Sequence, residues 1–289
     1  MMLDSVSIST ARGRALAMAL VVVSGFVSGR ADSAVLNFTN TTVNGIGQST
    51  VTVQSTTYVA GTINNAIFRR PISSDDSKSG SGGFRDLYTV DSNSGAESGY
   101  NRDGVMDSKA ANGFFPEITV GDLVADSTGL AYVFAIDTNE AGNATDKFIS
   151  LDDFRIYVGG PTAPSPLPQD FAGVDSQLGV NVYAMNETGQ DNHVLLDYSL
   201  YSGSGQMDLF VIVPKVFFDG FALDSQVYIY TEFGSYGDAP GFDPSAGPEQ
   251  VSLAKVDSPP VNPFLTPIPE PSSLVLLLAG GALLFRRRR

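Results

Sequence analysis

Oxygen-bearing side chains give this sequence its clearest candidates for chemistry. Asp137, Asn139, Asp146 and Asp152 lie in one short stretch of the chain. Calcium takes about six to eight oxygen ligands, and short acidic loops can supply them, so these four residues are candidate calcium ligands. Their spacing does not match an EF-hand, and Asp and Asn also form turns through their own side chains. We therefore predict no obligate cofactor and no other metal site, with calcium at these four residues as the alternative.

Nucleophilic catalysis has little support in the sequence. His193 is the only histidine and there is no cysteine. Zinc sites usually need more of these residues, and no Gly-x-Ser-x-Gly elbow precedes a helix. We predict that His193 is a structural residue at a strand edge and that the chain has no catalytic residue. Because 31 acidic residues leave room for a glycosidase-like carboxylate pair, a secreted polysaccharide hydrolase remains an alternative.

The elements that would position these residues are predicted to be strands. Runs of alternating or continuous apolar residues are separated by clusters of Gly, Asn, Asp and Ser, which is typical of an all-β sandwich rather than a parallel α/β sheet. No internal repeat is present, and between the two ends of the chain no window of helical period exceeds a couple of turns. The predicted strands cover residues 35–38, 49–59, 66–68, 130–136, 148–158, 180–185, 194–201, 209–213 and 227–233.

Three stretches are predicted to be irregular. Residues 73–83 form a polar, glycine-rich loop, and residues 160–168 contain four prolines, which indicates a long loop or an internal linker. Residues 237–268 are rich in proline and acidic residues and are predicted to form a stalk. The β-sandwich body, of jelly-roll type, is accordingly placed at residues 32–236.

The charge of the chain excludes one class of partner. Between residues 32 and 268 there are 29 acidic and 10 basic residues, a net charge near −19. Without a basic stripe, the body cannot displace counterions from phosphates, so nucleic acid is excluded. An acidic surface favours solubility and could attract divalent cations. The absence of cysteine means that the body must be stabilised by its core rather than by disulfides.

The first 31 residues are typical of a secretory signal peptide. Arg12 and Arg14 precede an apolar run over residues 15–23, which is short for a bilayer span, and small residues follow. We predict cleavage after Ala31, with Ser33 and Ala34 as alternative sites. A signal helix that persists as an N-terminal anchor is the other interpretation.

The last residues combine three features at the end of the chain. Pro269, Glu270 and Pro271 precede an uncharged segment, residues 272–285, and four arginines follow it: Arg286, Arg287, Arg288 and Arg289. An apolar helix of about a dozen residues covers only ~18 Å of a ~30 Å hydrocarbon core, so by length alone it could be a core helix. The arginines favour a transmembrane helix, because they can reach the headgroups and place this end in the cytoplasm.

Together, the tripeptide, the short helix and the basic cluster resemble the PEP-CTERM sorting signal of Gram-negative bacteria that make exopolysaccharide. In that family a membrane peptidase, exosortase, is thought to recognise the tripeptide. The resemblance implies that Pro269–Pro271 form the recognition motif, that residues 272–285 span the membrane and that the four arginines form the stop signal. The body also resembles PEP-CTERM β-proteins without an assigned activity, over Gly61-Thr62-Ile63, Leu195-Leu196-Asp197-Tyr198 and Tyr228-Ile229-Tyr230 among other short pieces.

These features favour an exported, non-catalytic surface or matrix protein. Its expected partners are signal peptidase, an exosortase-type peptidase, the membrane through the C-terminal helix, and exopolysaccharide. It would be anchored before processing and would then lie at the cell surface or in the extracellular matrix. A calcium-stabilised carbohydrate-binding or adhesive module is the first alternative, and the polysaccharide hydrolase is the second.

Overall fold

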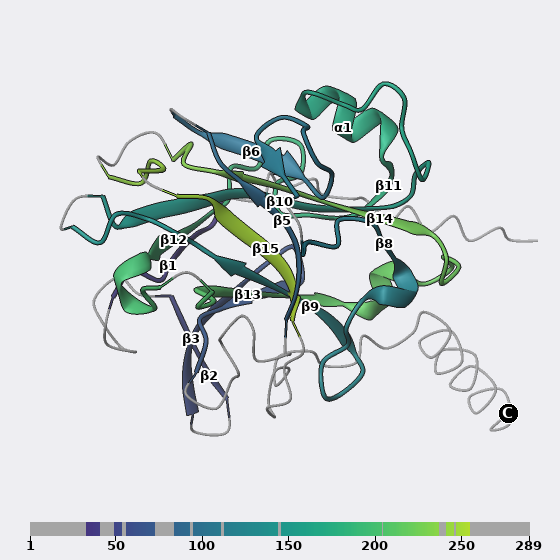
Figure 1. Ribbon diagram of the computed structural model, residues 1–289. Helices are drawn as coiled ribbons and strands as arrows, with labels where there is room; N and C mark the ends of the chain where they lie inside the picture. The colour runs from purple at the N-terminus through teal and green to yellow at the C-terminus, as the bar shows by residue number, and fades with distance from the viewer. Residues whose placement is uncertain are drawn as a thin grey trace, which may run out of the picture. The chain divides into compact units, whose positions relative to one another are not determined.

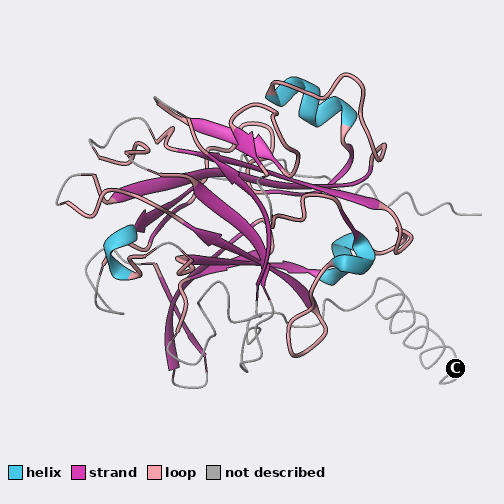
Figure 2. Ribbon diagram, in the orientation of Figure 1, coloured by secondary structure: helices cyan, strands magenta, loops and turns pink. Residues whose placement is uncertain are grey.

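The computed structural model describes the body of the chain and leaves out both ends. The described residues are 33–40, 49–53, 56–72, 84–92, 95–110, 113–143, 146–203, 205–236, 241–245 and 247–254. Within them the protein is all-β, with two sheets and a few short helices (Figures 1 and 2).

A seven-stranded sheet is built around the longest described strand, β10. Its order is β1-β12-β10-β14-β6, and two shorter strands complete it: β11 pairs with the second half of β10, and β8 pairs with β14. Only β1 and β12 are parallel; every other pair is antiparallel. The strands are β1 (Val35–Asn37), β6 (Glu97–Tyr100), β8 (Ile118–Thr119), β10 (Phe148–Gly159), β11 (Gly179–Ala184), β12 (His193–Asp197) and β14 (Gln226–Phe233).

An eight-stranded antiparallel sheet forms the second layer. Its order is β2-β3-β4-β13-β9-β15-β5-β7. The strands are β2 (Thr50–Val53), β3 (Thr56–Ile63), β4 (Ala66–Arg69), β5 (Phe84–Val90), β7 (Ser108–Lys109), β9 (Ala131–Asp137), β13 (Leu209–Pro214) and β15 (Glu249–Ala254).

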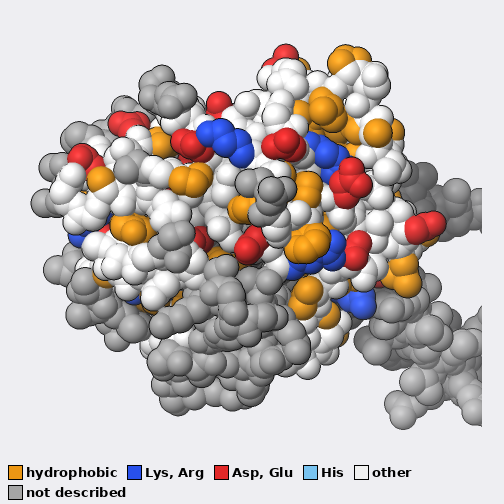
Figure 3. Space-filling model, in the orientation of Figure 1, with side chains coloured by type: hydrophobic (Ala, Val, Ile, Leu, Met, Phe, Trp, Pro, Cys, Tyr) orange, Lys and Arg blue, Asp and Glu red, His pale blue; other side chains and the backbone are white. Residues whose placement is uncertain are grey.

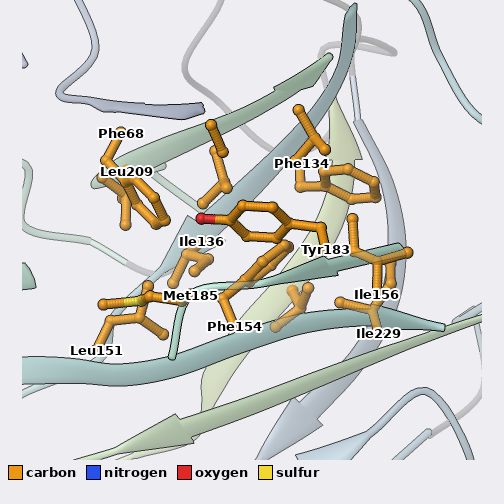
Figure 4. Packing of buried hydrophobic residues seen from close by; sticks show 14 of the residues in the cluster. Phe68, Phe134, Ile136, Leu151, Phe154, Ile156, Tyr183, Met185, Leu209 and Ile229 are labelled. Carbon is orange, nitrogen blue, oxygen red and sulfur yellow. The ribbon is translucent and has the colours of Figure 1, made fainter. Parts of the chain in front are cut away.

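The main core lies between the two sheets. Strand β9 shows why, because Tyr132, Phe134 and Ile136 alternate along it and all belong to one large apolar cluster. From the other sheet, Phe154 of β10 brings its ring centroid to 5.6 Å from that of Phe134. Figure 4 shows Tyr183 of β11 within the same cluster, beside Phe134 and Phe154.

The described helices are short and lie in the connections. Helix α1 (Phe171–Gln177) begins where the side chain of Asp170 accepts a hydrogen bond from the main chain of Gly173, as an N-cap should. Three single turns of 3-10 helix complete the set: η1 (Val120–Asp122), η2 (Tyr198–Leu200) and η3 (Lys215–Phe218).

The stalk predicted over residues 237–268 is wrong for its middle part. Residues 249–254 form β15, which lies between β9 and β5 well inside the eight-stranded sheet, and Val251 and Leu253 point into the core. Its alternating apolar residues were not recognised as a strand in the sequence, because the segment is short and is surrounded by proline and acidic residues. The body therefore extends to residue 254, beyond its predicted end at 236.

The proline-rich stretch at residues 160–168 is a loop within the seven-stranded sheet. It leads from β10 through α1 to β11, and β11 pairs directly with β10. Prolines cannot donate main-chain hydrogen bonds, but their carbonyl groups still accept them. The hydroxyl groups of Tyr100 and Tyr228 donate to the carbonyl oxygens of Pro168 and Pro161 respectively. These bonds hold the loop against the sheet, so it does not separate two domains.

Candidate functional site

The four candidate calcium ligands are not brought to one point. Asp152, on β10, bonds with His193 and with the main chain of Ser235. Asp146 instead closes a local turn with Asn143, whose side chain donates to its carboxylate at 2.7 Å. Asp152 therefore belongs to a different cluster from Asp146.

Asp137 and Asn139 also have partners of their own. The carboxylate of Asp137 accepts a hydrogen bond from the main chain of Gly205, and the amide of Asn139 donates to the carbonyl oxygen of Pro248 at 3.1 Å. Burial raises the pKa of Asp137 to about 7, because an ionised carboxylate loses its hydration there. Among the residues that the structure describes, no group of three acidic, histidine or cysteine side chains could hold a metal ion.

His193 lies at the start of β12 and is clamped between two aspartates. Its Nδ1 atom is 2.7 Å from Oδ1 of Asp152, and its Nε2 atom is 3.1 Å from Oδ1 of Asp191. The ring of Tyr236 meets the imidazole edge-on, with centroids 4.7 Å apart. Since both ring nitrogens face carboxylates, neither faces a nucleophile, and the geometry is that of a structural ion pair rather than of a catalytic triad.

The clamp determines the charge of His193. Burial alone lowers the pKa of this imidazole, but the hydrogen bond and charge of Asp152, with those of Asp191, outweigh burial and raise it above its usual range. The charged form is therefore favoured in the folded protein. Its contribution to stability is present at low pH and is lost as the pH rises through the raised pKa.

Replacing His193 by alanine is expected to lower the free energy of unfolding at pH 6 by about 3 kcal/mol, because the buried carboxylate of Asp152 loses its charged partner. The control is Asp191→Asn, since the Asp191 side chain is 82% exposed and its pairing should contribute about 1 kcal/mol or less. Chemical denaturation of both variants measures the two effects. Equal losses in the two variants would contradict the assignment of Asp152 as the main partner.

An open cleft of about 610 Å³ lies at the C-terminal end of β11, a size usual for ligand sites. We name it the β11 cleft. Its lining is dominated by polar side chains and includes four asparagines. The lining residues are Asn64, Asn65, Arg155, Asn181, Val182, Tyr183, Ala184, Asn186, Glu187, Thr188 and Phe217.

The hairpin between β3 and β4 builds one wall of the β11 cleft. Asn64 and Asn65 both have positive φ, at 46° and 67°, which is the conformation of a two-residue type I′ turn and one that asparagine tolerates. The amide of Asn64 donates to the carbonyl oxygen of Ala184 at 2.9 Å and so ties the hairpin to β11. Asn65 beside it remains exposed.

Arg155 is the one cation among the lining residues, and its charge is already balanced. Its Nε atom is 2.5 Å from Oδ2 of Asp153, and Nη2 donates to the main-chain carbonyl of Asn186 at 2.6 Å. The guanidinium group also lies 4.5 Å from the ring centroid of Phe171. Arg155 therefore holds the wall of the cleft together and offers little free charge to a ligand.

The first described residues belong to the folded body. The hydroxyl of Ser33 accepts a hydrogen bond from the main chain of Asp191, and the main chain of Ala34 donates to Asn192. The carbonyl of Ala34 in turn accepts from His193. Cleavage after Ser33 or Ala34 would remove part of this edge, whereas cleavage after Ala31 would leave it intact.

The predicted sorting residues lie outside the described part of the chain. These are Ala31, Pro269, Glu270, Pro271, the helix at residues 272–285 and the arginines at 286–289. Within the described residues, none of the helices has the length and apolar character needed to cross a bilayer.

Sequence reasoning did not identify the β11 cleft. Its signal was weak, because Asn64-Asn65 between two strands predicts a turn but not what the turn faces. Asn181 and Phe217 come from other parts of the chain, and the tertiary contact between β11 and η3 brings them together. In comparisons with protein-family models, curated proteins and solved structures, nothing matches this chain.

Proposed function

We propose that this chain is an exported, non-catalytic protein of the cell surface or extracellular matrix, released or transferred by an exosortase-type peptidase and associated with the exopolysaccharide layer. Its body is a β-sandwich of jelly-roll type between an N-terminal signal helix and a C-terminal transmembrane helix. The observation that supports this proposal most is the sequence pattern at the two ends: an apolar run after Arg12 and Arg14, and a Pro-Glu-Pro tripeptide, a short apolar segment and four arginines at the other end. Between them lies a body in which the only histidine is held by two carboxylates.

The surface of the body supports an extracellular role. Acidic side chains are scattered over the face in Figure 3 rather than gathered into one field, which favours solubility at high local concentration. Calcium is not part of the proposal, since its candidate ligands bond to different partners.

The two ends of the mature protein provide the direct test. Mass spectrometry of the protein recovered from its native host is expected to find Asp32 as the first residue and a C-terminus near Pro269. The first expectation rests on the small residues near Ala31, and the hydrogen bonds of Ser33 and Ala34 to the body favour this site over the alternative sites after Ser33 and Ala34. A mature chain that still ends at Arg289 would overturn the processing step.

A matched pair of variants tests the signal itself. Glu270→Ala alters the tripeptide and should cause the unprocessed form to accumulate in the membrane fraction. Glu249→Ala would not be a suitable control, because Glu249 is buried in β15. Glu187→Ala is suitable, since this glutamate is exposed in the body, and processing of that variant should match the parent.

A further inference from the structure

We propose that the β11 cleft binds a neutral polysaccharide chain. The proposal rests on the proposed function and deepens it, because it names a ligand class for an extracellular β body. Its test measures polysaccharide binding by the cleft and does not depend on how the chain is sorted. It depends on three features of the lining: polar groups without partners, a half-buried aromatic ring, and the absence of spare positive charge.

The unpartnered polar groups match sugar hydroxyls. Asn65, Asn181 and Thr188 are exposed in the cleft, and none of their side chains makes a hydrogen bond to another described residue. An amide carries both donors and an acceptor, and a hydroxyl can play either role. A sugar ring presents hydroxyl groups with the same dual capacity, so these side chains can pair with several of them at once.

Phe217 supplies an apolar surface among these polar groups. It lies in η3, is half-buried, and stacks on Tyr183 with centroids 6.3 Å apart and planes 20° from parallel. Tyr183 is itself fixed, because its hydroxyl donates to the carbonyl oxygen of Ile63. A rigid ring beside amide groups can pack against the C–H face of a sugar while the amides bond its hydroxyls.

Charge selects a neutral ligand over an acidic one. Arg155 is paired with Asp153, Glu187 adds a negative charge at the rim, and the chain as a whole has a net charge of −14. An anionic polymer would approach against this field without a free cation to receive it. The open form of the cleft suits a chain that enters and leaves rather than a small enclosed molecule.

An extended peptide is the alternative occupant, because β11 pairs only with β10 among the described strands. The carbonyl of Ala184 points away from β10 to Asn64, on the side of β11 that pairs with no described strand. An extended peptide could pair with such an edge. The side-chain lining favours sugar, since strand pairing needs no cluster of free amides.

Affinity electrophoresis of the mature protein tests the proposal, with hydroxyethylcellulose, galactomannan and dextran as neutral probes and alginate as the acidic probe. We expect retardation by at least one neutral polymer and none by alginate. Asn65→Gly, which keeps the positive φ, and Asn181→Ala should each weaken binding about fivefold to tenfold, as expected for one lost hydrogen bond. Phe217→Leu, which keeps apolar packing, should weaken it about tenfold or more.

Asn143→Ala and Phe115→Leu are the controls, because they remove an exposed amide and an exposed aromatic ring outside the cleft. Thermal melting verifies that every variant is folded. The proposal is overturned if no neutral polymer retards the protein, if alginate alone does, or if binding survives the three cleft variants. Binding of a Val/Thr-rich decapeptide instead, abolished by Val182→Pro, would overturn it in favour of strand pairing. None of these results depends on how the C-terminus is processed.

Discussion

Replacing Phe154 by alanine is expected to lower the free energy of unfolding by about 4 kcal/mol, which is the usual cost of removing a large aromatic ring from a core. Phe154 is fully buried on β10 and lies between Phe134 and Tyr183, with centroids 5.6 Å and 6.3 Å away (Figure 4). It therefore joins the two sheets, and its loss leaves a cavity that neither sheet can close alone. Urea denaturation measures the effect.

Phe115→Ala is the control for this prediction. Phe115 is 54% exposed and packs against the guanidinium group of Arg85 at the surface. Its replacement should cost about 1 kcal/mol or less. A loss of similar size in both variants would mean that the interface between the sheets is not the main source of stability.

The stability of the protein is expected to fall between pH 5.5 and pH 8.5. Glu97, on β6, is 1% exposed, and burial raises its pKa from 4.5 to about 8, helped by the nearby charges of Glu140, Asp91 and Asp107. Because the folded state favours the neutral acid, stability is greatest below the unfolded pKa and is lost as the pH rises through the folded one. At about 1.4 kcal/mol per pH unit, Glu97 alone accounts for a loss of about 3 kcal/mol.

Two other groups change stability in the same direction. Asp137, with its pKa raised to about 7, and His193, with its pKa raised by Asp152, both contribute less as the pH increases. Denaturation curves at half-unit pH steps would measure the combined slope. A stability that is constant or rises over this range would contradict the prediction.

Glu97→Gln isolates the contribution of that one residue. The amide cannot ionise, so the variant should match the parent at pH 5.5 within about 1 kcal/mol and exceed its stability at pH 8.5 by about 2 kcal/mol. Glu117→Gln is the matched control, because Glu117 is exposed. An identical pH dependence in Glu97→Gln and the parent would assign the slope to other groups.

The fold was predictable where strands are long and apolar. β9, β10, β13 and β14 were predicted within a residue or two, since their residues bury against both neighbours and leave a clear pattern. β6, β7 and β8 were missed because they are only two to four residues long, and β15 because the segments around it resemble a stalk. The seven-residue β5 was also missed, because the charged residues Arg85 and Asp86 interrupt its apolar pattern. Such strands are stabilised by main-chain hydrogen bonds to neighbouring strands, and the local amino-acid composition does not indicate these bonds.

The candidate site was less predictable for a different reason. Asp137 and Asp152 were grouped because they are close in sequence, but along a strand successive side chains point to opposite faces and a loop separates β9 from β10. The partner of Asp152 is His193, which is 41 residues away. Two candidates that looked unrelated thus form one cluster, while the four that looked related do not.

By itself the sequence determined that the body is all-β and acidic and that it lacks disulfides, because these properties follow from residue type and periodicity. It also contains the two terminal segments, residues 1–31 and 269–289, from which the proposed sorting signals are inferred. The tertiary structure decided which strands are neighbours, that residues 249–254 join the core, and that a hairpin, an edge strand and η3 line the β11 cleft. Such arrangements depend on pairing between strands that are distant in the sequence. The free energy of this pairing is spread over many contacts, so no single residue type or local pattern predicts it.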